Sequence, residues 1–80
     1  MRKIVLFLVL FISFVYAKVD INKATMDELH FLKGIGHAKA VAIIKYRKKH
    51  SFKKIEDIMN VKGIGKKIFE KIKNEIEVKN

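Results

Sequence analysis

All four glycines of this chain lie in two identical triplets, Gly34-Ile35-Gly36 and Gly63-Ile64-Gly65, which are twenty-nine residues apart. Glycine adopts positive φ without a steric penalty and lets another group come close to the backbone. A chain that has glycine nowhere else therefore uses it for two copies of one turn. Each triplet follows a lysine, Lys33 or Lys62, and precedes an amphipathic segment with further lysines. This arrangement predicts a helix–turn–helix unit that occurs twice.

The chain overlays on itself when it is shifted by twenty-nine residues. Besides the triplets, the matching pairs are Glu28 and Asp57, Leu29 and Ile58, Leu32 and Val61, and Ile43 and Ile72. Because two repeats are too few for an open solenoid, we expect a compact pair with pseudo-two-fold symmetry. The chain contains no proline and no long stretch in which polar and apolar residues alternate. The predicted fold class is therefore all-α.

Four helices are predicted, over 26–32, 37–49, 55–60 and 66–77, from apolar residues spaced three and four apart. Thr25 and Glu28 form a capping box at the start of the first helix. The third helix has a poor N-cap, because Lys54 stands where Ser, Thr or Asp is expected. Phe52, in the connector 50–54, is expected to fill the core. The other residues expected on buried faces are Leu29, Leu32, Ala40, Ile43, Ile44, Ile68, Phe69, Ile72 and Ile76.

Residues 1–17 are predicted to be an export signal that precedes a single domain over 18–80. Arg2 and Lys3 stand before an apolar run over 4–15, and Ala17 offers a small residue for cleavage. Twelve apolar residues are few for a bilayer core, which takes about 20. An uncleaved anchor in the inner membrane is the alternative. Cleavage leaves sixteen Lys and Arg against eight Asp and Glu, a net charge of +8.

This excess of positive charge indicates an anionic partner, such as nucleic acid, anionic lipid or an acidic polymer. The chain has no cysteine, which excludes thiol catalysis, disulfides and thiolate metal sites. Neither His30 nor His50 has a second ligand at metal-binding spacing, and both are expected at the surface. No metal and no cofactor are therefore expected.

The basic residues after the triplets are placed against the helix dipole. Lys66 and Lys67 lie in the first turn of the 66–77 helix, where positive charge is unfavourable. His37 and Lys39 lie similarly in the 37–49 helix. An external anion would satisfy the free N–H groups, the dipole and the lysines together. The alternative is that each triplet only terminates a helix. In either case the central isoleucines, Ile35 and Ile64, are expected to anchor the turns in the core.

Residues 29–40 and 55–67 each resemble a helix-hairpin-helix motif. The opening segment 19–25 and the pair Tyr46-Arg47 resemble the ComEA-type competence proteins, the DNA receptors of natural transformation. The resemblance covers residues 19–78 and the export signal. It implies a tandem helix-hairpin-helix domain of the SAM-like type that binds double-stranded DNA without sequence preference. It also implies a periplasmic location and a part in DNA uptake.

The chain departs from the family pattern at three places. Lys33 stands where proline is common, the connector before Phe52 is about one residue short and lacks Gly-Pro, and Lys54 replaces a capping serine. These differences bear on the geometry of the connector rather than on the hairpins.

We predict that two hairpins hold phosphates on opposite strands across a minor groove. The predicted ligands are the backbone N–H groups of Gly34, Gly36, Gly63 and Gly65, with charge from Lys33, Lys39, Lys62, Lys66 and Lys67 and a hydrogen bond from His37. The lysines interpreted instead as solvated are Lys45, Lys48, Lys49, Lys71, Lys73 and Lys79. Several molecules would be needed along one DNA to retain it. Self-association on DNA and contact with the uptake machinery stay open.

Catalysis is not expected, because two hairpins leave no room for a separate catalytic pocket in so short a chain. A basic module for a membrane surface or a protein partner is an alternative, but it leaves the glycine triplets unexplained. A third alternative keeps DNA binding and assigns it to nutrition or biofilm. The sequence does not separate these purposes.

Overall fold

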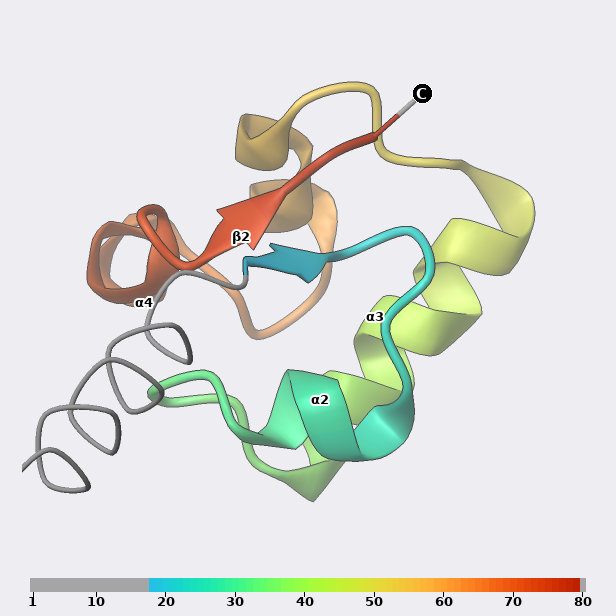
Figure 1. Ribbon diagram of the computed structural model, residues 1–80. Coiled ribbons are helices and arrows are strands. Elements are labelled where there is room, and N and C mark those ends of the chain that lie inside the picture. Colours follow the sequence, from blue (N-terminus) through green and yellow to red (C-terminus); the bar gives the residue numbers. More distant parts are fainter. Residues whose placement is uncertain (1–17, 80) are drawn as a thin grey trace, which may run out of the picture.

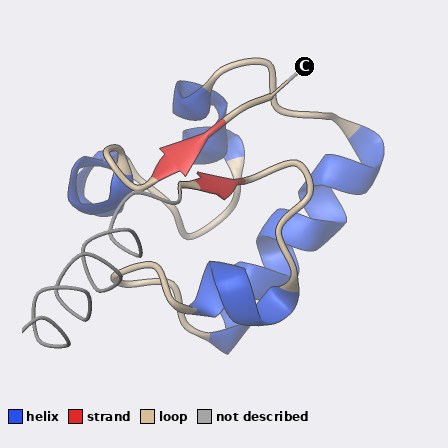
Figure 2. Ribbon diagram, in the orientation of Figure 1, coloured by secondary structure: helices blue, strands red, loops and turns tan. Residues whose placement is uncertain are grey.

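The computed structural model describes residues 18–79. Its elements are β1 (Val19–Asp20), α2 (Met26–His30), α3 (His37–Lys49), η1 (Ile55–Asn60), α4 (Lys66–Ile72) and β2 (Ile76–Glu77) (Figure 1). Helices make up half of this part of the chain, and the strands are two residues each (Figure 2). The all-α prediction is confirmed, with one short parallel pairing of β1 and β2 added. The predicted export signal over 1–17 lies outside the described residues.

Helix α2 begins where its capping box predicts. The Thr25 hydroxyl accepts from the Glu28 N–H at 3.2 Å, and the Glu28 carboxylate accepts from the Thr25 N–H at 2.9 Å. The helix ends at His30, two residues before the predicted end. The chain tightens there, because the Leu32 N–H donates to the Leu29 carbonyl, three residues back. This tightening leads directly into the first hairpin.

The 55–60 segment is a 3-10 helix, and the Asp57 carboxylate supports the backbone at its N-terminus. One carboxylate oxygen of Asp57 accepts from the N–H groups of Lys53 at 2.9 Å and Lys54 at 3.3 Å. The Lys54 side chain has no oxygen that could accept from the first turn of η1, and Asp57 instead accepts from the N–H groups at and just before the N-cap. The poor N-cap predicted at Lys54 is confirmed, because its side chain makes no capping hydrogen bond.

The last helix, α4, ends at Ile72, whereas the sequence predicted helix to residue 77. The chain turns over 73–75 and enters β2, in which Ile76 pairs with Val19 of β1. The Glu75 carbonyl accepts from the Val19 N–H at 2.9 Å, and the Glu77 carbonyl accepts from the Ile21 N–H at 3.1 Å. Ile76 is buried in this strand. The apolar period that predicted helix is thus satisfied by a strand whose partner lies at the other end of the domain.

One hydrophobic core joins the two repeats, and it contains seven of the nine residues predicted on buried faces, with the other two packed against it. Leu29, Leu32, Ala40, Ile43, Phe69, Ile72 and Ile76 are buried, whereas Ile44 and Ile68 are half-buried at its edge. Phe52 is 1% exposed, as predicted. Asn22 fixes the connector around it, because its side-chain amide donates to the Phe52 carbonyl and accepts from the Phe52 N–H, both at 2.8 Å. The shortened connector is therefore well anchored.

Candidate nucleic-acid interface

Each glycine triplet begins with the same tight turn. The Ile35 N–H donates to the Leu32 carbonyl at 3.1 Å, and the Ile64 N–H donates to the Val61 carbonyl at 3.0 Å. The third residue of each turn has positive φ, 80° at Gly34 and 93° at Gly63. Since no other described residue has positive φ, both are type II turns, which require glycine at this position. Hairpin 1 denotes residues 32–36 and hairpin 2 denotes residues 61–65.

The second glycine of each triplet begins a helix and is not required by the fold. Gly36 and Gly65 are the N-caps of α3 and α4, with extended backbone at φ of −82° and −104°. A Cβ atom added to either glycine would meet no atom within 4 Å. A Cβ at either position would therefore contact no other part of the domain. What glycine provides here is an open approach to the backbone from solvent.

The N-termini of α3 and α4 have no side-chain cap, in contrast to α2. The first N–H groups of a helix have no partner within the helix and carry a partial positive charge. Neither first turn contains an acidic residue, and both contain basic ones. An anion at Gly36 or Gly65 would therefore meet free donors and positive charge together.

The central isoleucines anchor the hairpins, as predicted. Ile35 is 3% exposed and Ile64 is 2% exposed, and both belong to the common core. A buried side chain between two glycines holds the turn against the body of the domain. The backbone that faces solvent is thereby placed before any ligand arrives.

Each hairpin packs against the helix that follows the other hairpin. A Cβ on Gly34 would lie 3.7 Å from the Ile68 side chain of α4, and one on Gly63 would lie 3.7 Å from the Lys39 side chain of α3. Lys39 and Ile68 are themselves twenty-nine residues apart. Each hairpin therefore packs on the equivalent position of the other repeat, which is the geometry expected of a pseudo-two-fold pair.

Because of this crossing, more of the predicted basic side chains lie at hairpin 2 than at hairpin 1. Lys33 and His37 are exposed around hairpin 1, and Lys62, Lys66 and Lys67 are exposed around hairpin 2. Lys39 is predicted from sequence to act beside His37. In the structure its half-buried side chain packs over Gly63. Its charge therefore adds to hairpin 2, whereas the equivalent contact at hairpin 1 is made by the apolar Ile68. Hairpin 2 is the more positive of the two.

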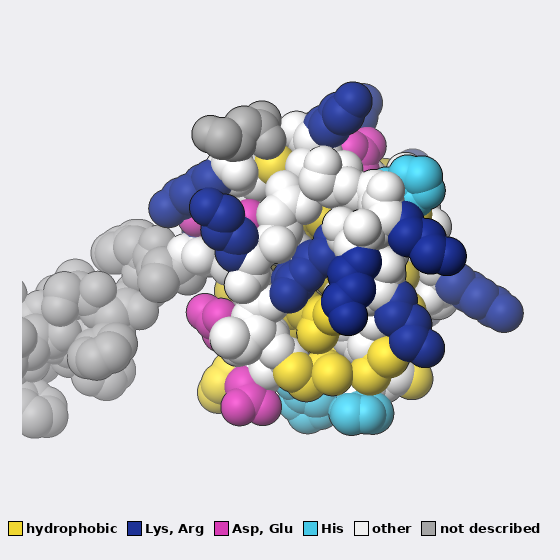
Figure 3. Space-filling view, turned by 90° about the vertical axis from the view of Figure 1, so that its right-hand side faces the viewer, with side chains coloured by type: hydrophobic (Ala, Val, Ile, Leu, Met, Phe, Trp, Pro, Cys, Tyr) yellow, Lys and Arg dark blue, Asp and Glu magenta, His cyan; other side chains and the backbone are white. Residues whose placement is uncertain are grey.

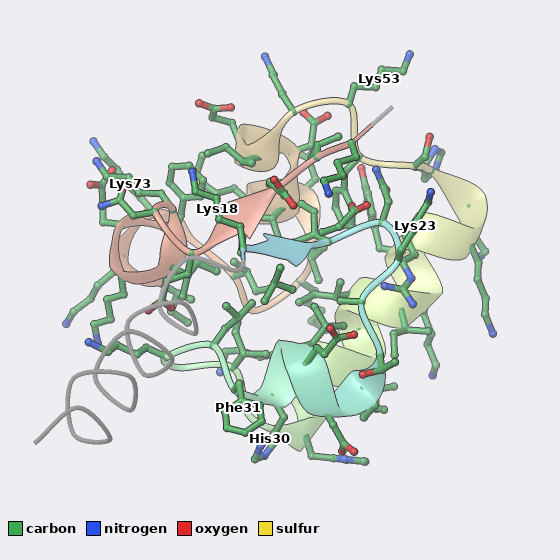
Figure 4. All side chains as sticks on the ribbon, viewed as in Figure 1. Lys18, Lys23, His30, Phe31, Lys53 and Lys73 are labelled. Carbon is green, nitrogen blue, oxygen red and sulfur yellow. The ribbon has the colours of Figure 1, made fainter. Side chains whose placement is uncertain are left out.

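Other lysines surround the domain rather than gathering at the hairpins. Lys18, Lys23, Lys53 and Lys73 come from separate segments, and Lys23 and Lys53 lie on the other side of the view from Lys73 (Figure 4). Lys73 pairs with Glu70 at 2.8 Å. The hydrogen bond from Lys73, and then its charge, hold the pKa of the exposed Glu70 carboxyl below its usual range, with a smaller contribution from the charge of Lys66. Lys73 is therefore engaged with Glu70 of its own helix rather than with a hairpin.

Two features were missed from sequence. Phe31 is 87% exposed, the large hydrophobic side chain that the described chain leaves in solvent, and it points away from the body beside α2 (Figure 4). Lys45 and Lys49, interpreted as solvated, line a groove next to hairpin 2. The repeat carried a signal for Phe31, since it matches the exposed, polar Asn60, whereas no pattern in the sequence marked Lys45 and Lys49.

Within residues 18–79, no group of three or more His, Asp or Glu side chains is placed to hold a metal ion. The face turned to the viewer in Figure 3 has Lys and Arg side chains across its centre and few acidic ones. This face is the right-hand side of Figure 1, where α3 ends, and not the side on which hairpin 1 lies. At the hairpins themselves, uncapped N–H groups and exposed basic residues favour the binding of an anion.

Comparison with known proteins agrees with this geometry. A family model described as a helix-hairpin-helix motif matches residues 15–77. The chain is 55% identical over 64 residues to ComE operon protein 1 of Bacillus subtilis (strain 168), covering 79% of this chain and 31% of that protein. It is 46% identical over 61 residues to an uncharacterized protein of Haemophilus influenzae, covering 74% of this chain and 54% of that protein.

A third relative is a larger protein. The chain is 42% identical over 60 residues to the human endonuclease/exonuclease/phosphatase family domain-containing protein 1, of which it covers 10%. The chain thus spans between a tenth and about half of the length of these relatives. The family match over most of the chain confirms the helix-hairpin-helix prediction, and the likeness to ComE operon protein 1 agrees with the predicted resemblance: the chain belongs to the helix-hairpin-helix family.

Proposed function

We propose that this domain binds double-stranded DNA through its phosphates and without sequence preference. The observation that carries the proposal is the pair of uncapped helix N-termini at Gly36 and Gly65, each open to solvent and flanked by basic residues. The pseudo-two-fold would present these N-termini to the two strands across a minor groove. Phosphate contacts position a protein on DNA but carry no sequence information.

The proposed phosphate-binding groups are those predicted from the sequence, except that one lysine is assigned to the other hairpin. Backbone N–H groups at the two triplets bind phosphate oxygens, Lys33 and His37 assist at hairpin 1, and Lys62, Lys66 and Lys67 assist at hairpin 2. Lys39 joins the second group, because its stem lies over Gly63. Neither a metal nor a cofactor is needed for such binding.

The proposed setting is DNA uptake in natural transformation, outside the cytoplasmic membrane. Its supports are the signal-like segment 1–17 and the likeness to ComE operon protein 1. Within residues 18–79, no helix has the length and apolarity to cross a bilayer. Retention by an uncleaved N-terminal anchor, and a role in nutrition or biofilm, are the alternatives within the same binding function. Contact with the uptake machinery belongs to this proposal.

A non-enzymatic role is part of the proposal. The human relative carries the words endonuclease, exonuclease and phosphatase in its name, but the likeness covers only a tenth of that protein. The shared segment corresponds to the two hairpins of this chain. We therefore assign this chain the binding module and no catalytic step.

A salt titration tests the proposal. Residues 18–80 are mixed with fluorescent duplexes of two unrelated sequences, and binding is followed by anisotropy between low and physiological salt. Contacts to four to six phosphates predict a slope of log K against log salt of about −4 to −5, with affinity on the order of micromolar. The two duplexes should give the same curve. Absence of binding at low salt, despite the net charge of +8, would show that the hairpins are only structural turns.

A further inference from the structure

A groove of about 370 Å³ runs between α3 and the segment that enters hairpin 2. Its lining residues are Ala42, Lys45, Tyr46, Lys49, Asn60, Val61 and Lys62. The floor is apolar, since Ala42 is half-buried and Val61 is buried. The Asn60 side-chain amide donates to the Tyr46 hydroxyl at 3.4 Å across it. The two walls are thus joined by a polar contact on an otherwise apolar surface.

Three ammonium groups surround this floor, and no carboxylate lines it. Lys45 and Lys49 are exposed and one helical turn apart on α3, so their side chains share a face. Lys62 stands exposed on the opposite wall. An occupant must therefore be anionic at its edges and apolar enough in between to cover Ala42 and Val61. The sugar–phosphate backbone of a nucleic acid has both properties.

The groove is continuous with the proposed phosphate site. Lys62 is the second residue of the type II turn in hairpin 2, and it lines the groove as well. A strand held by the N–H groups at Gly65 therefore has the groove beside it. Resting on the proposed function, we infer that the groove takes the stretch of the same strand that adjoins the phosphate at hairpin 2. Lys45 and Lys49 bind its phosphates, and the apolar floor packs on its sugars.

The groove beside hairpin 2 has no equivalent in the other repeat. A shift by twenty-nine residues places Asn74 on Lys45, Glu75 on Tyr46 and Val78 on Lys49. The chain has also left the helix at this point, because α4 ends at Ile72. Hairpin 1 therefore has no basic groove of the same kind. The DNA footprint extends beyond hairpin 2 and not beyond hairpin 1, so the domain contacts the two strands unequally.

The test compares two variants with equal loss of charge. K45Q/K49Q removes the groove lysines. K23Q/K53Q removes two exposed lysines that lie outside the groove and both hairpins. Both variants should fold, since all four side chains are exposed, and circular dichroism checks this. Binding to the duplex is measured by anisotropy as a function of salt, with poly-glutamate as a second probe.

Loss of two phosphate contacts predicts that K45Q/K49Q lowers the steepness of the salt dependence by about 1.8, whereas K23Q/K53Q leaves it near that of the unaltered chain. Equal slopes for the two variants, with binding otherwise intact, would overturn the groove assignment and leave the proposed function standing. Unchanged DNA binding with loss of poly-glutamate binding would overturn it in favour of an acidic protein segment. Failure of the unaltered chain to bind DNA would overturn both proposals.

Discussion

Single residues in this domain separate sharply into those that hold the fold and those that face solvent. The two glycines of each triplet show the division within one turn. Gly34 and Gly63 have positive φ and are required by the backbone. Gly36 and Gly65 have ordinary φ and open space where a Cβ would lie. The same motif therefore contains one glycine that the backbone requires and one that leaves the backbone open to solvent.

Among residues 18–79, the most and the least exposed phenylalanines make a matched stability test. Phe52 is 1% exposed and stacks on Tyr46 with ring centroids 5.2 Å apart. Phe52→Ala should lower the free energy of unfolding by about 3–5 kcal/mol, the range for a buried aromatic side chain. Phe31→Ala, at 87% exposure, should change it by no more than about 0.5 kcal/mol. Urea unfolding measures both, and similar losses in the two variants would contradict this view of the core.

Local signals predict the elements well where the causes are local. The capping box at Thr25, the apolar spacing of α3 and the bounds of η1 were all read from nearby residues. The end of α4 could not be predicted from nearby residues. Ile76 continues the helical spacing of apolar residues, and its strand partner, Val19, is at the far end of the domain. The Asp57 cap was missed because the expected acceptor was sought at Lys54 alone.

The Asp57 cap gives a prediction for η1. Asp57→Ala removes the oxygen that accepts from Lys53 and Lys54 and should lower the free energy of unfolding by about 0.5–2 kcal/mol. Glu56→Ala removes the same charge from the exposed neighbouring position and should have a smaller effect. Thermal unfolding followed by circular dichroism measures the difference. Equal effects would mean that charge, rather than the backbone hydrogen bonds, is what Asp57 provides.

At the scale of the whole molecule, the repeat accounts for what the sequence predicted about the site. The packing of the two repeats against each other accounts for what the sequence did not predict. The triplets and their lysines were visible as a twenty-nine-residue repeat. The crossing of Lys39 onto Gly63 depends on how the repeats pack, and no local pattern encodes it. The groove likewise joins α3 to the segment before hairpin 2. Lys45 and Lys49 look in sequence like any solvated lysines, and only their placement beside Lys62 distinguishes them.

The central claim is that the open N-termini of α3 and α4 are the anion sites, and the double variant G36S/G65S tests it most directly. Serine fits the extended backbone at both positions, and its hydroxyl can cap the helix that now lacks a side-chain cap. Thermal stability should therefore stay the same or rise slightly. DNA affinity should fall at least tenfold, about 1.4 kcal/mol, because the hydroxyl occupies the N–H groups that a phosphate would bind.

The measurement is the melting temperature and the anisotropy titration of G36S/G65S beside the unaltered domain. We predict that stability and DNA affinity change in opposite directions. A variant that is equally stable and binds the duplex with undiminished affinity would contradict the account, since the phosphates would then be held elsewhere on the basic surface.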